Sequence, residues 1–535
     1  INEGYKDFLF GWKCRSGKTY GAGYLIQEYL LAFKSCNVLI ILPTPNETSP
    51  QFHEDVFVKF KNFDEFNILK INSSSQLLNN LDSIDKNIII ISKQMLDYSI
   101  RNEQKTFLDK ININLIIFDE NHFSGTSNKT EFILNKYSNK NTIRLYLTAT
   151  YSKTLNKWPI EDNCQFYWNI EDEINAKNRN ISYFVNKFGY DTSYFLNNEN
   201  KEYILKSYDS MPEMMIIQTS FDDDIYYDIK EEIKDTSYGF SYETLFSLNK
   251  KQDKFNYGNE IVLLLNKITG TIPNKKYIID KKGIYNRIKN LSLKYSSRTF
   301  VDDNFCTQLW FLPFGINNNI NNVSICLKEL ITNHYGFKDF DVMIINSHQN
   351  IKNLKNEIKN SEINAQANHK KGLILLAGTQ CHLGITLPLC DIVFLLNNNQ
   401  SSSRIIQMMY RCMSESSDSS KKIGYVVDFN INRILNTLID FSEKEFNSIE
   451  DNIKYLIENN LIKIDDDIFD NNEKSNELIE QLMNKWISNS KDITNNLLNK
   501  LKHSDFDLDE DDQHLLNKSY YSLEQSNKNI VLNLT

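Results

Sequence analysis

Short apolar runs alternate with longer segments of mixed polar and apolar residues along the first 150 positions of the chain. Runs that are apolar throughout are typical of strands buried on both faces, as in a parallel sheet covered by helices. The pattern therefore predicts an α/β unit. Its expected strands lie at residues 8–11, 38–42, 87–92, 115–119 and 144–148.

The same alternation returns in the second half of the chain and predicts a second α/β unit. Its expected strands are 213–219, a run from 308, 341–346, 372–377, 391–396 and 424–428. A Lys-rich helical pattern at about 222–300 interrupts this unit, and helical periodicity continues after 440. The predicted organisation is a first lobe at 1–152, a linker at 153–207, a second lobe at 208–440 with an insertion at about 222–300, and a mainly helical, acidic C-terminal extension at 441–535.

Charge is distributed unevenly along the chain. The formal net charge is −9, which by itself argues against a nucleic-acid-binding protein. Residues 440–535, however, hold 21 acidic and 10 basic residues, so the remainder carries a net charge of about +2. The acidic stretch from Asp505 is expected to be solvated surface. Nucleic acid therefore stays a candidate partner of the two lobes.

Composition excludes several other classes of protein. No apolar stretch approaches the roughly 20 residues of a membrane-spanning helix, so no membrane association is expected. The eight cysteines form no CxxC pair, which indicates neither a zinc site nor a disulfide framework. We expect a reducing, intracellular compartment. The chain opens with Ile1 and no leader, and we expect it to be a fragment that lacks an N-terminal part.

The strongest local motif is WKCRSGKT at residues 12–19, between an expected strand and an expected helix. Backbone N–H groups of such a loop cradle phosphates, a lysine (Lys18) reaches the β and γ oxygens, and a hydroxyl (Thr19) ligates Mg²⁺. Trp12 stands where the GxxxxGK[ST] pattern has its first glycine. The alternative is a strand-to-helix turn with an incidental GKT. The candidate nucleotide contacts are Arg15, Ser16, Gly17, Lys18 and Thr19.

Two further basic residues and two carboxylates accompany this loop. Lys13 and Arg15 are expected to be exposed loop residues, with phosphate contact as the alternative. Asp119 and Glu120 end an apolar run; Asp119 suits Mg²⁺ and Glu120 suits a general base for the attacking water. The alternative for this pair is an ordinary strand end.

Taken in chain order, these segments resemble the motifs of superfamily 2 helicases. DENH at 119–122 resembles the DEAH box, TAT at 148–150 resembles the SAT motif, the segment 378–388 resembles motif V, and QMMYR at 407–411 resembles motif VI. The resemblance implies two RecA-like P-loop lobes with parallel sheets, ATP and Mg²⁺ as cofactors, and an ATP-dependent helicase or translocase that hydrolyses ATP between the lobes.

The resemblance also assigns roles to individual residues. It implies catalytic roles for Lys18, Asp119, Glu120, Gln407 and Arg411, and a nucleotide contact for Gly384. It implies coupling of hydrolysis to movement by His122, Thr148 and Thr150, although His122 also suits a core position. The implied nucleic-acid contacts are Pro43, Thr44, Ser92 and Thr379.

Several positions depart from the family pattern. Tyr410 replaces the glycine and Ser414 the last arginine of the motif VI pattern QxxGRxxR, which leaves Arg411 as the clear arginine finger, with Arg404 as a candidate helper. Thr386 stands where many relatives have Asp. The aromatic run from Trp310 to Phe314 is interpreted as a buried strand and its exit, the alternative being a base-stacking surface.

The motif sequences look most like the helicases of nucleocytoplasmic large DNA viruses, which would place the protein in host cytoplasm or virion. DNA is the expected substrate rather than RNA, and the insertion and the extension are candidate surfaces for protein partners. Three alternatives stay open. In the first, the chain is the motor part of a restriction-type or multifunctional enzyme with a missing N-terminal nuclease. In the second, it is a catalytically weak helicase-like nucleic-acid-binding or virion protein. In the third, it translocates or displaces transcription complexes without separating strands.

Overall fold

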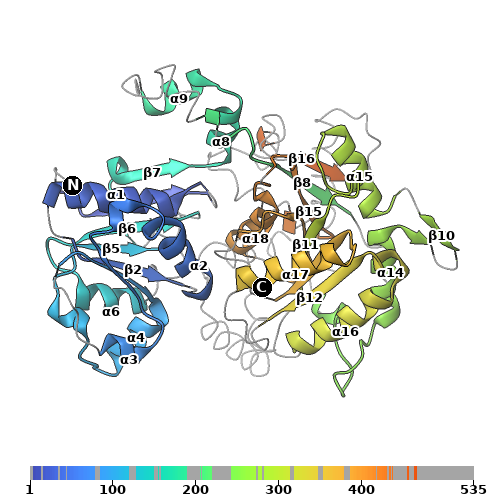
Figure 1. Ribbon diagram of the computed structural model, residues 1–535, viewed down its shortest axis with the longest axis horizontal. Helices are drawn as coiled ribbons and strands as arrows, with labels where there is room; N and C mark the ends of the chain where they lie inside the picture. The colour runs from blue at the N-terminus through green and yellow to red at the C-terminus, as the bar shows by residue number, and fades with distance from the viewer. Residues whose placement is uncertain are drawn as a thin grey trace, which may run out of the picture.

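The computed structural model contains two seven-stranded sheets, each formed by a different half of the chain (Figure 1). It describes residues 4–13, 16–33, 36–43, 45–78, 85–119, 128–149, 155, 158–189, 205–206, 208–219, 242–272, 275–279, 282–313, 319–346, 354–378, 386–399, 401–416, 418–430, 433–434, 437, 455–456 and 463–466.

The first sheet has the strand order β3-β4-β2-β5-β6-β1-β7, and every pairing is parallel. Its strands are β1 (Asp7–Trp12), β2 (Val38–Leu42), β3 (Asn67–Lys70), β4 (Asn87–Ser92), β5 (Leu115–Phe118), β6 (Ile143–Thr148) and β7 (Gln165–Trp168). Its helices are α1 (Lys18–Phe33), α2 (Pro45–Phe52), α3 (Ser74–Leu77), α4 (Lys93–Arg101) and α6 (Asn128–Tyr137), with short helical turns at His53–Phe57, Lys61–Phe63, Phe107–Lys110 and Asp162–Cys164.

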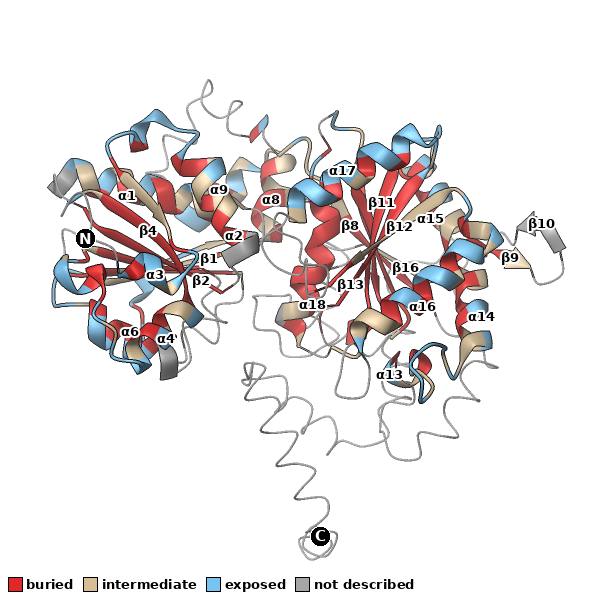
Figure 2. Ribbon diagram, turned by 60° about the horizontal axis from the view of Figure 1, so that its bottom comes forward, coloured by how far each residue is buried: buried red, intermediate tan, exposed pale blue. Residues whose placement is uncertain are grey.

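Alternating residues of each central strand enter two different cores of this lobe. Val38, Ile40 and Leu42 pack with α1 and α2 on one face, and Leu39 and Ile41 pack with α4 and α6 on the other. Each is fully buried, which stabilises the fold by about 1.5–3 kcal/mol per side chain. This two-sided burial explains why the strands are apolar at every position (Figure 2).

Part of the expected linker belongs to the first sheet. Residues Gln165–Trp168 form β7, which pairs with β1 at the sheet edge. Two helices follow, α8 (Ile170–Lys177) and α9 (Ile181–Phe188). Lys177 of α8 binds Glu213 of the second sheet through an Nζ–Oε1 contact of 2.9 Å. In both ribbon views α8 lies at the junction of the two lobes (Figures 1 and 2).

The second sheet has the order β12-β13-β11-β14-β15-β8-β16, again with parallel pairings. Its strands are β8 (Glu213–Gln218), β11 (Cys306–Phe311), β12 (Phe340–Ile345), β13 (Gly372–Ala377), β14 (Cys390–Leu395), β15 (Ile423–Asp428) and β16 (Lys463–Asp466). A separate hairpin-like pair consists of β9 (Thr271–Ile272) and β10 (Lys275–Ile279). The helices are α13 (Tyr242–Leu245), α14 (Gly258–Thr269), α15 (Ile284–Lys294), α16 (Ile320–Asn333), α17 (Leu354–Ala367) and α18 (Ser402–Met409), with short turns at Tyr335–Phe337 and at η7 (Tyr410–Met413).

Helices α14 and α15 come from the segment expected to be an insertion, and they are integral to the second lobe. Leu265 and Ile288 are fully buried in the same core cluster as Trp310 of the sheet. Trp310 is itself fully buried and donates its indole N–H to Gln308 at 3.1 Å. The interpretation of this aromatic run as a buried strand is therefore confirmed for Trp310 and Phe311.

The C-terminal region contributes an edge strand to the second sheet. Residues Lys463–Asp466 form β16, an edge strand that pairs in parallel with β8. Asp465 also accepts from the Arg287 guanidinium, with an Nη2–Oδ2 distance of 2.7 Å. β16 therefore belongs to the second sheet, although it lies beyond residue 440 in the predicted C-terminal extension. No helix among the residues that the structure describes combines the length and the apolar character needed to cross a membrane.

Candidate nucleotide site

The GKT motif lies at the carboxyl end of β1, where the chain turns into α1. Gly17 has a φ of +88°, a left-handed conformation that glycine adopts without strain. Ser16 donates from its hydroxyl to the Lys13 carbonyl at 2.8 Å and closes the turn. Lys18 begins α1, and its Nζ donates to the Trp12 carbonyl at 3.1 Å. The positive end of a sixteen-residue helix thus faces the turn, as an anion site requires.

Trp12, which replaces the first glycine of the motif, is accommodated by packing. Its ring stacks on Phe10 with centroids 4.7 Å apart and planes 5° apart. A Cβ added to Gly21 in α1 would lie 2.9 Å from the Trp12 ring, so the small residue in the helix makes room for the large one before it. This departure from the family pattern therefore leaves the strand-turn-helix arrangement in place.

The predicted metal carboxylate lies at the same edge of the sheet. Asp119 directly follows β5, is 7% exposed, and donates its backbone N–H to the Ile41 carbonyl at 3.0 Å. Only β6 separates β5 from β1, and Thr148 at the end of β6 is fully buried beside Gly11 in β1. The carboxyl ends of parallel strands all lie at the same end of the sheet. The structure therefore brings Lys18, Asp119 and Thr148 together at that end.

The donor chemistry at this edge fits a magnesium ion. Thr19 offers a hydroxyl in the first turn of α1, and Asp119 offers a buried carboxylate. Oxygen donors of this kind, few in number and completed by phosphate and water, are what Mg²⁺ prefers. The residues present therefore suit the ion that the P-loop pattern implies.

Two of the expected nucleic-acid contacts lie at neighbouring strand ends. Pro43 follows β2, and its carbonyl accepts from the Gln94 side-chain amide at 3.2 Å. Ser92 is 5% exposed and caps α4 by accepting from the Met95 N–H at 3.2 Å. Both positions lie at the carboxyl ends of their strands, where the Ser92 hydroxyl serves as the N-cap of α4.

The motif VI segment is buried in the second lobe. Gln407 in α18 is fully buried, and Arg411 in η7 is 5% exposed. The Arg411 Nε donates to the Gln407 carbonyl at 3.1 Å. Ser414, which replaces the last arginine of the motif, accepts from the Leu387 N–H at 3.1 Å and so joins the end of motif V to motif VI.

The two lobes meet through a residue of the P-loop. Lys13 is 7% exposed, forms an ion pair with Glu173 of α8, and lies with Nζ 4.9 Å from the centroid of the Tyr410 ring. The expectation that Lys13 is an exposed loop residue is therefore wrong, because its charge is neutralised by Glu173 and covered by the Tyr410 ring. Sequence reasoning missed Glu173, since an acidic residue in a polar helix carries no motif.

The remaining predicted residues lie outside the part of the chain that the structure describes. They are Arg15, Thr44, Glu120, His122, Thr150, Thr379 and Gly384.

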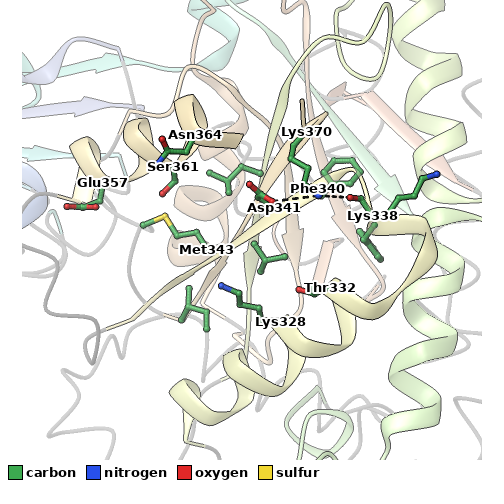
Figure 3. A pocket seen from close by; sticks show the side chains of 14 residues that line it. Lys328, Thr332, Lys338, Phe340, Asp341, Met343, Glu357, Ser361, Asn364 and Lys370 are labelled. Atoms are coloured by element: carbon green, nitrogen blue, oxygen red, sulfur yellow. Dashed lines mark hydrogen bonds and ion pairs between the residues drawn. The ribbon is translucent and has the colours of Figure 1, made fainter. Parts of the chain in front are cut away.

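A cavity of about 960 Å³ lies elsewhere, at the β12 edge of the second sheet between α16 and α17 (Figure 3). Lys328, Asp341, Glu357 and Lys370 contribute to its lining, and Lys370 donates to the Lys338 carbonyl at 2.7 Å. No residue with a predicted catalytic or binding role lines it. This cavity is therefore not the nucleotide site. The nucleotide site is identified instead by the P-loop turn and the residues at the ends of the neighbouring strands.

Comparison with known proteins concerns the fold and the first lobe. Residues 1–153 match the family described as type III restriction enzyme, res subunit. Among solved structures, the ATP-dependent Type ISP restriction-modification enzyme LlaBIII bound to DNA is 13% identical with a TM-score of 0.51, covering 92% of this chain and 32% of that one. Dbp5 of S. cerevisiae bound to RNA and ADP BeF3 is 10% identical with a TM-score of 0.41, covering 90% of this chain and 89% of that one. A search of curated proteins found no match.

The fold consists of two α/β lobes with one parallel sheet in each, and it is similar to the fold of the LlaBIII structure. More particularly, the match to the restriction-enzyme res-subunit family falls on the first lobe. The chain spans about a third of the length of the LlaBIII polypeptide to which it is similar.

Proposed function

We propose that this chain hydrolyses ATP between its two lobes and uses the cycle to move along, or remodel, nucleic acid. The observation that carries the proposal is the meeting of the P-loop with motif VI: Lys13, five residues before Lys18, lies against Tyr410, the neighbour of Arg411. Neither lobe alone holds both the phosphate-binding turn and the arginine. A nucleotide bound at α1 therefore favours the closed arrangement of the lobes, and its hydrolysis releases that arrangement.

The proposed roles follow from position. The turn at Gly17 and the start of α1 bind the phosphates, with Lys18 leaving the Trp12 carbonyl for the phosphate oxygens. Thr19 and Asp119 would hold Mg²⁺, which neutralises phosphate charge when bound. Arg411 acts across the cleft on charge that develops during phosphoryl transfer.

The partner that we propose is DNA, held through its backbone. The match to a restriction-enzyme subunit family supports DNA over RNA. Pro43 and Ser92 lie at the sheet edge where such contacts are proposed, together with Thr44 and Thr379. Contacts to phosphates are largely independent of sequence and weaken steeply with salt.

An ATPase assay with and without single-stranded DNA or RNA, repeated across salt concentrations, tests the proposal. Lys18→Ala removes the phosphate ligand and is expected to abolish nucleotide binding. Arg411→Ala is expected to keep binding but lower kcat by about 10³- to 10⁵-fold, as removal of an arginine finger does. Arg101→Ala is the matched control, because Arg101 is an exposed residue whose side chain pairs with Asp97 in the same helix. Unchanged turnover in both site variants would refute the motor function.

A second candidate is favoured by the comparisons. We propose, as the alternative, that the chain is the motor of a larger restriction-type enzyme, because the family match is to such a subunit and the chain covers 32% of LlaBIII. ATP-dependent cleavage of DNA by the complete polypeptide would support it, and ATP-dependent movement without cleavage would oppose it. Failure to bind ATP with Mg²⁺ would instead favour a helicase-like binding or virion protein.

Origin and compartment form part of the proposal. We propose a viral source among large DNA viruses, with host cytoplasm or virion as the location, on the basis of the motif sequences. The described cysteines are buried and form no disulfide with one another, which supports a reducing compartment. Detection of the protein in infected-cell cytoplasm or purified particles tests this assignment.

A further inference from the structure

One side chain connects three segments that are far apart in the sequence. Lys13 leaves the end of β1 and forms a buried ion pair with Glu173 of α8, where the two side chains are 8% and 7% exposed. Its Nζ also lies 4.9 Å from the centre of the Tyr410 ring, within range of a cation–π interaction. The contact therefore joins the P-loop, the segment between the lobes, and motif VI.

The backbone of Lys13 belongs to the phosphate-binding turn. Its N–H donates to the Trp168 carbonyl at 2.8 Å and extends the pairing of β1 with β7. Its carbonyl accepts from both the backbone N–H of Ser16, at 3.3 Å, and the Ser16 hydroxyl, at 2.8 Å. A shift of this residue therefore changes the turn that precedes Lys18.

Both partners of the ammonium group are anchored to the second lobe. Ile170 of α8 packs in the same core cluster as Tyr410, and Lys177 at the end of α8 binds Glu213 of β8. Glu173 therefore lies on a helix that is attached to the second sheet. Tyr410 begins η7, and the next residue is Arg411.

The charges of this contact depend on each other. Glu173 is 6% exposed, and burial raises the pKa of its carboxyl group while Lys13 acts in the opposite direction. A buried carboxylate is stable only beside a cation, and Lys13 supplies that cation. The Tyr410 ring covers the ammonium group on another side and helps exclude water.

We propose that Lys13 is a positioning residue that holds Arg411 in register with the P-loop during ATP hydrolysis, acting through Glu173 and Tyr410 and without contact to phosphate. The inference rests on the proposed function. Motif VI has tyrosine where its family has glycine, and this tyrosine provides the surface on which the lysine lies. Loss of the contact leaves Lys18 and Thr19 able to bind nucleotide but releases the arginine from its position.

The test separates nucleotide binding from turnover. Lys13→Met and Glu173→Gln are nearly isosteric and remove one charge each; ATP affinity and DNA-stimulated kcat are measured for each variant and for the double variant. We expect kcat to fall by about 100-fold, the loss typical of a misplaced catalytic group, while the Kd for ATP stays within about threefold. The double variant should be no slower than the single variants, because the same contact is lost in all three.

Two further variants keep the test decisive. Lys13→Arg retains the charge and should restore much of kcat relative to Lys13→Met, with thermal unfolding of both variants measured in parallel. Lys59→Met is the matched control: Lys59 is an exposed lysine of the same lobe, 5.7 Å from the Phe60 ring centroid, and its loss should leave kcat and Kd unchanged.

The outcomes are distinguishable. A Kd raised tenfold or more in Lys13→Met, with Glu173→Gln near wild type, identifies Lys13 as a phosphate ligand and overturns the proposal, as does wild-type kcat in both variants. The proposed ATPase function stands if the wild-type protein hydrolyses ATP and Lys18→Ala does not. In that case, each of these two outcomes contradicts only the positioning role of Lys13. A wild-type protein without ATPase activity removes the proposed function and this inference together.

Discussion

Gly17→Ala offers a direct test of the phosphate-binding turn. Gly17 has a φ of +88°, and no heavy atom lies within 4 Å of a Cβ built on it. The substitution therefore introduces backbone strain and no steric clash. It changes neither a charge nor a hydrogen-bonding side chain, so its effect reports the conformation of the turn.

The size of the effect follows from that conformation. An L-residue with a side chain costs about 1–2 kcal/mol in the left-handed region. Because nothing packs against the new methyl group, the nucleotide-free turn can relax to relieve the strain. ATP must then restore the left-handed conformation, and the cost becomes a loss of affinity of about 5- to 30-fold.

The assay is titration with a fluorescent ATP analogue and Mg²⁺, with thermal unfolding measured in parallel. Gly4→Ala is the matched control, since Gly4 has a φ of +89° and equally open surroundings but precedes the other end of β1. It should leave ATP affinity unchanged. Gly258→Ala, at an open position without positive φ, should change neither quantity.

The reasoning is refuted if Gly17→Ala binds ATP as tightly as wild type and unfolds at the same temperature. Equal affinity losses in Gly17→Ala and Gly4→Ala would also contradict it, because the effect would then not be specific to the turn. A lower unfolding temperature with unchanged affinity would show that the strained turn is retained in the free protein.

Two further substitutions test the second lobe. Ser414→Ala leaves the buried Leu387 N–H without its acceptor and should destabilise this lobe by about 1–3 kcal/mol, measured by chemical unfolding; a loss no larger than that of the exposed Ser182→Ala would contradict the assignment. His334 accepts from the Gly336 N–H at 3.1 Å and burial lowers its pKa, so the unfolded chain binds the proton first and stability should fall as pH drops below about 6.5. His334→Gln should flatten that part of the pH profile in thermal melts, and an unaltered slope would exclude this histidine as its source.

The central strands of both sheets could be predicted from the sequence alone. The runs at Val38–Leu42, Asn87–Ser92 and Gly372–Ala377 have the predicted bounds. A parallel strand covered on both faces must be apolar at nearly every position, and that requirement is visible without knowledge of its neighbours. The order of motifs along the chain likewise predicts the P-loop and its neighbouring carboxylate.

Three of the four edge strands could not be predicted in the same way; the fourth, β12, has six residues and matches the strand expected at 341–346. β3, β7 and β16 lie at the edges of their sheets, have four residues each, and are only partly buried where the structure describes them. Short half-buried segments do not need a continuous apolar run, so their sequences resemble loops or helices. Pairing with an existing strand, which only the folded structure supplies, makes them strands.

The contact between the lobes was decided by tertiary structure alone. Lys13 and Glu173 are separated by 160 positions, and Tyr410 lies further along still. The local sequence gives no sign of the contact: Lys13 is a basic residue in a loop, Glu173 is an acidic residue in a polar helix, and Tyr410 replaces a motif glycine. A lysine in a loop is normally solvated, and it becomes buried here because the fold brings a carboxylate and an aromatic ring to it at once. Local pattern thus determines the elements and the order of the motifs, whereas long-range packing determines which charges meet.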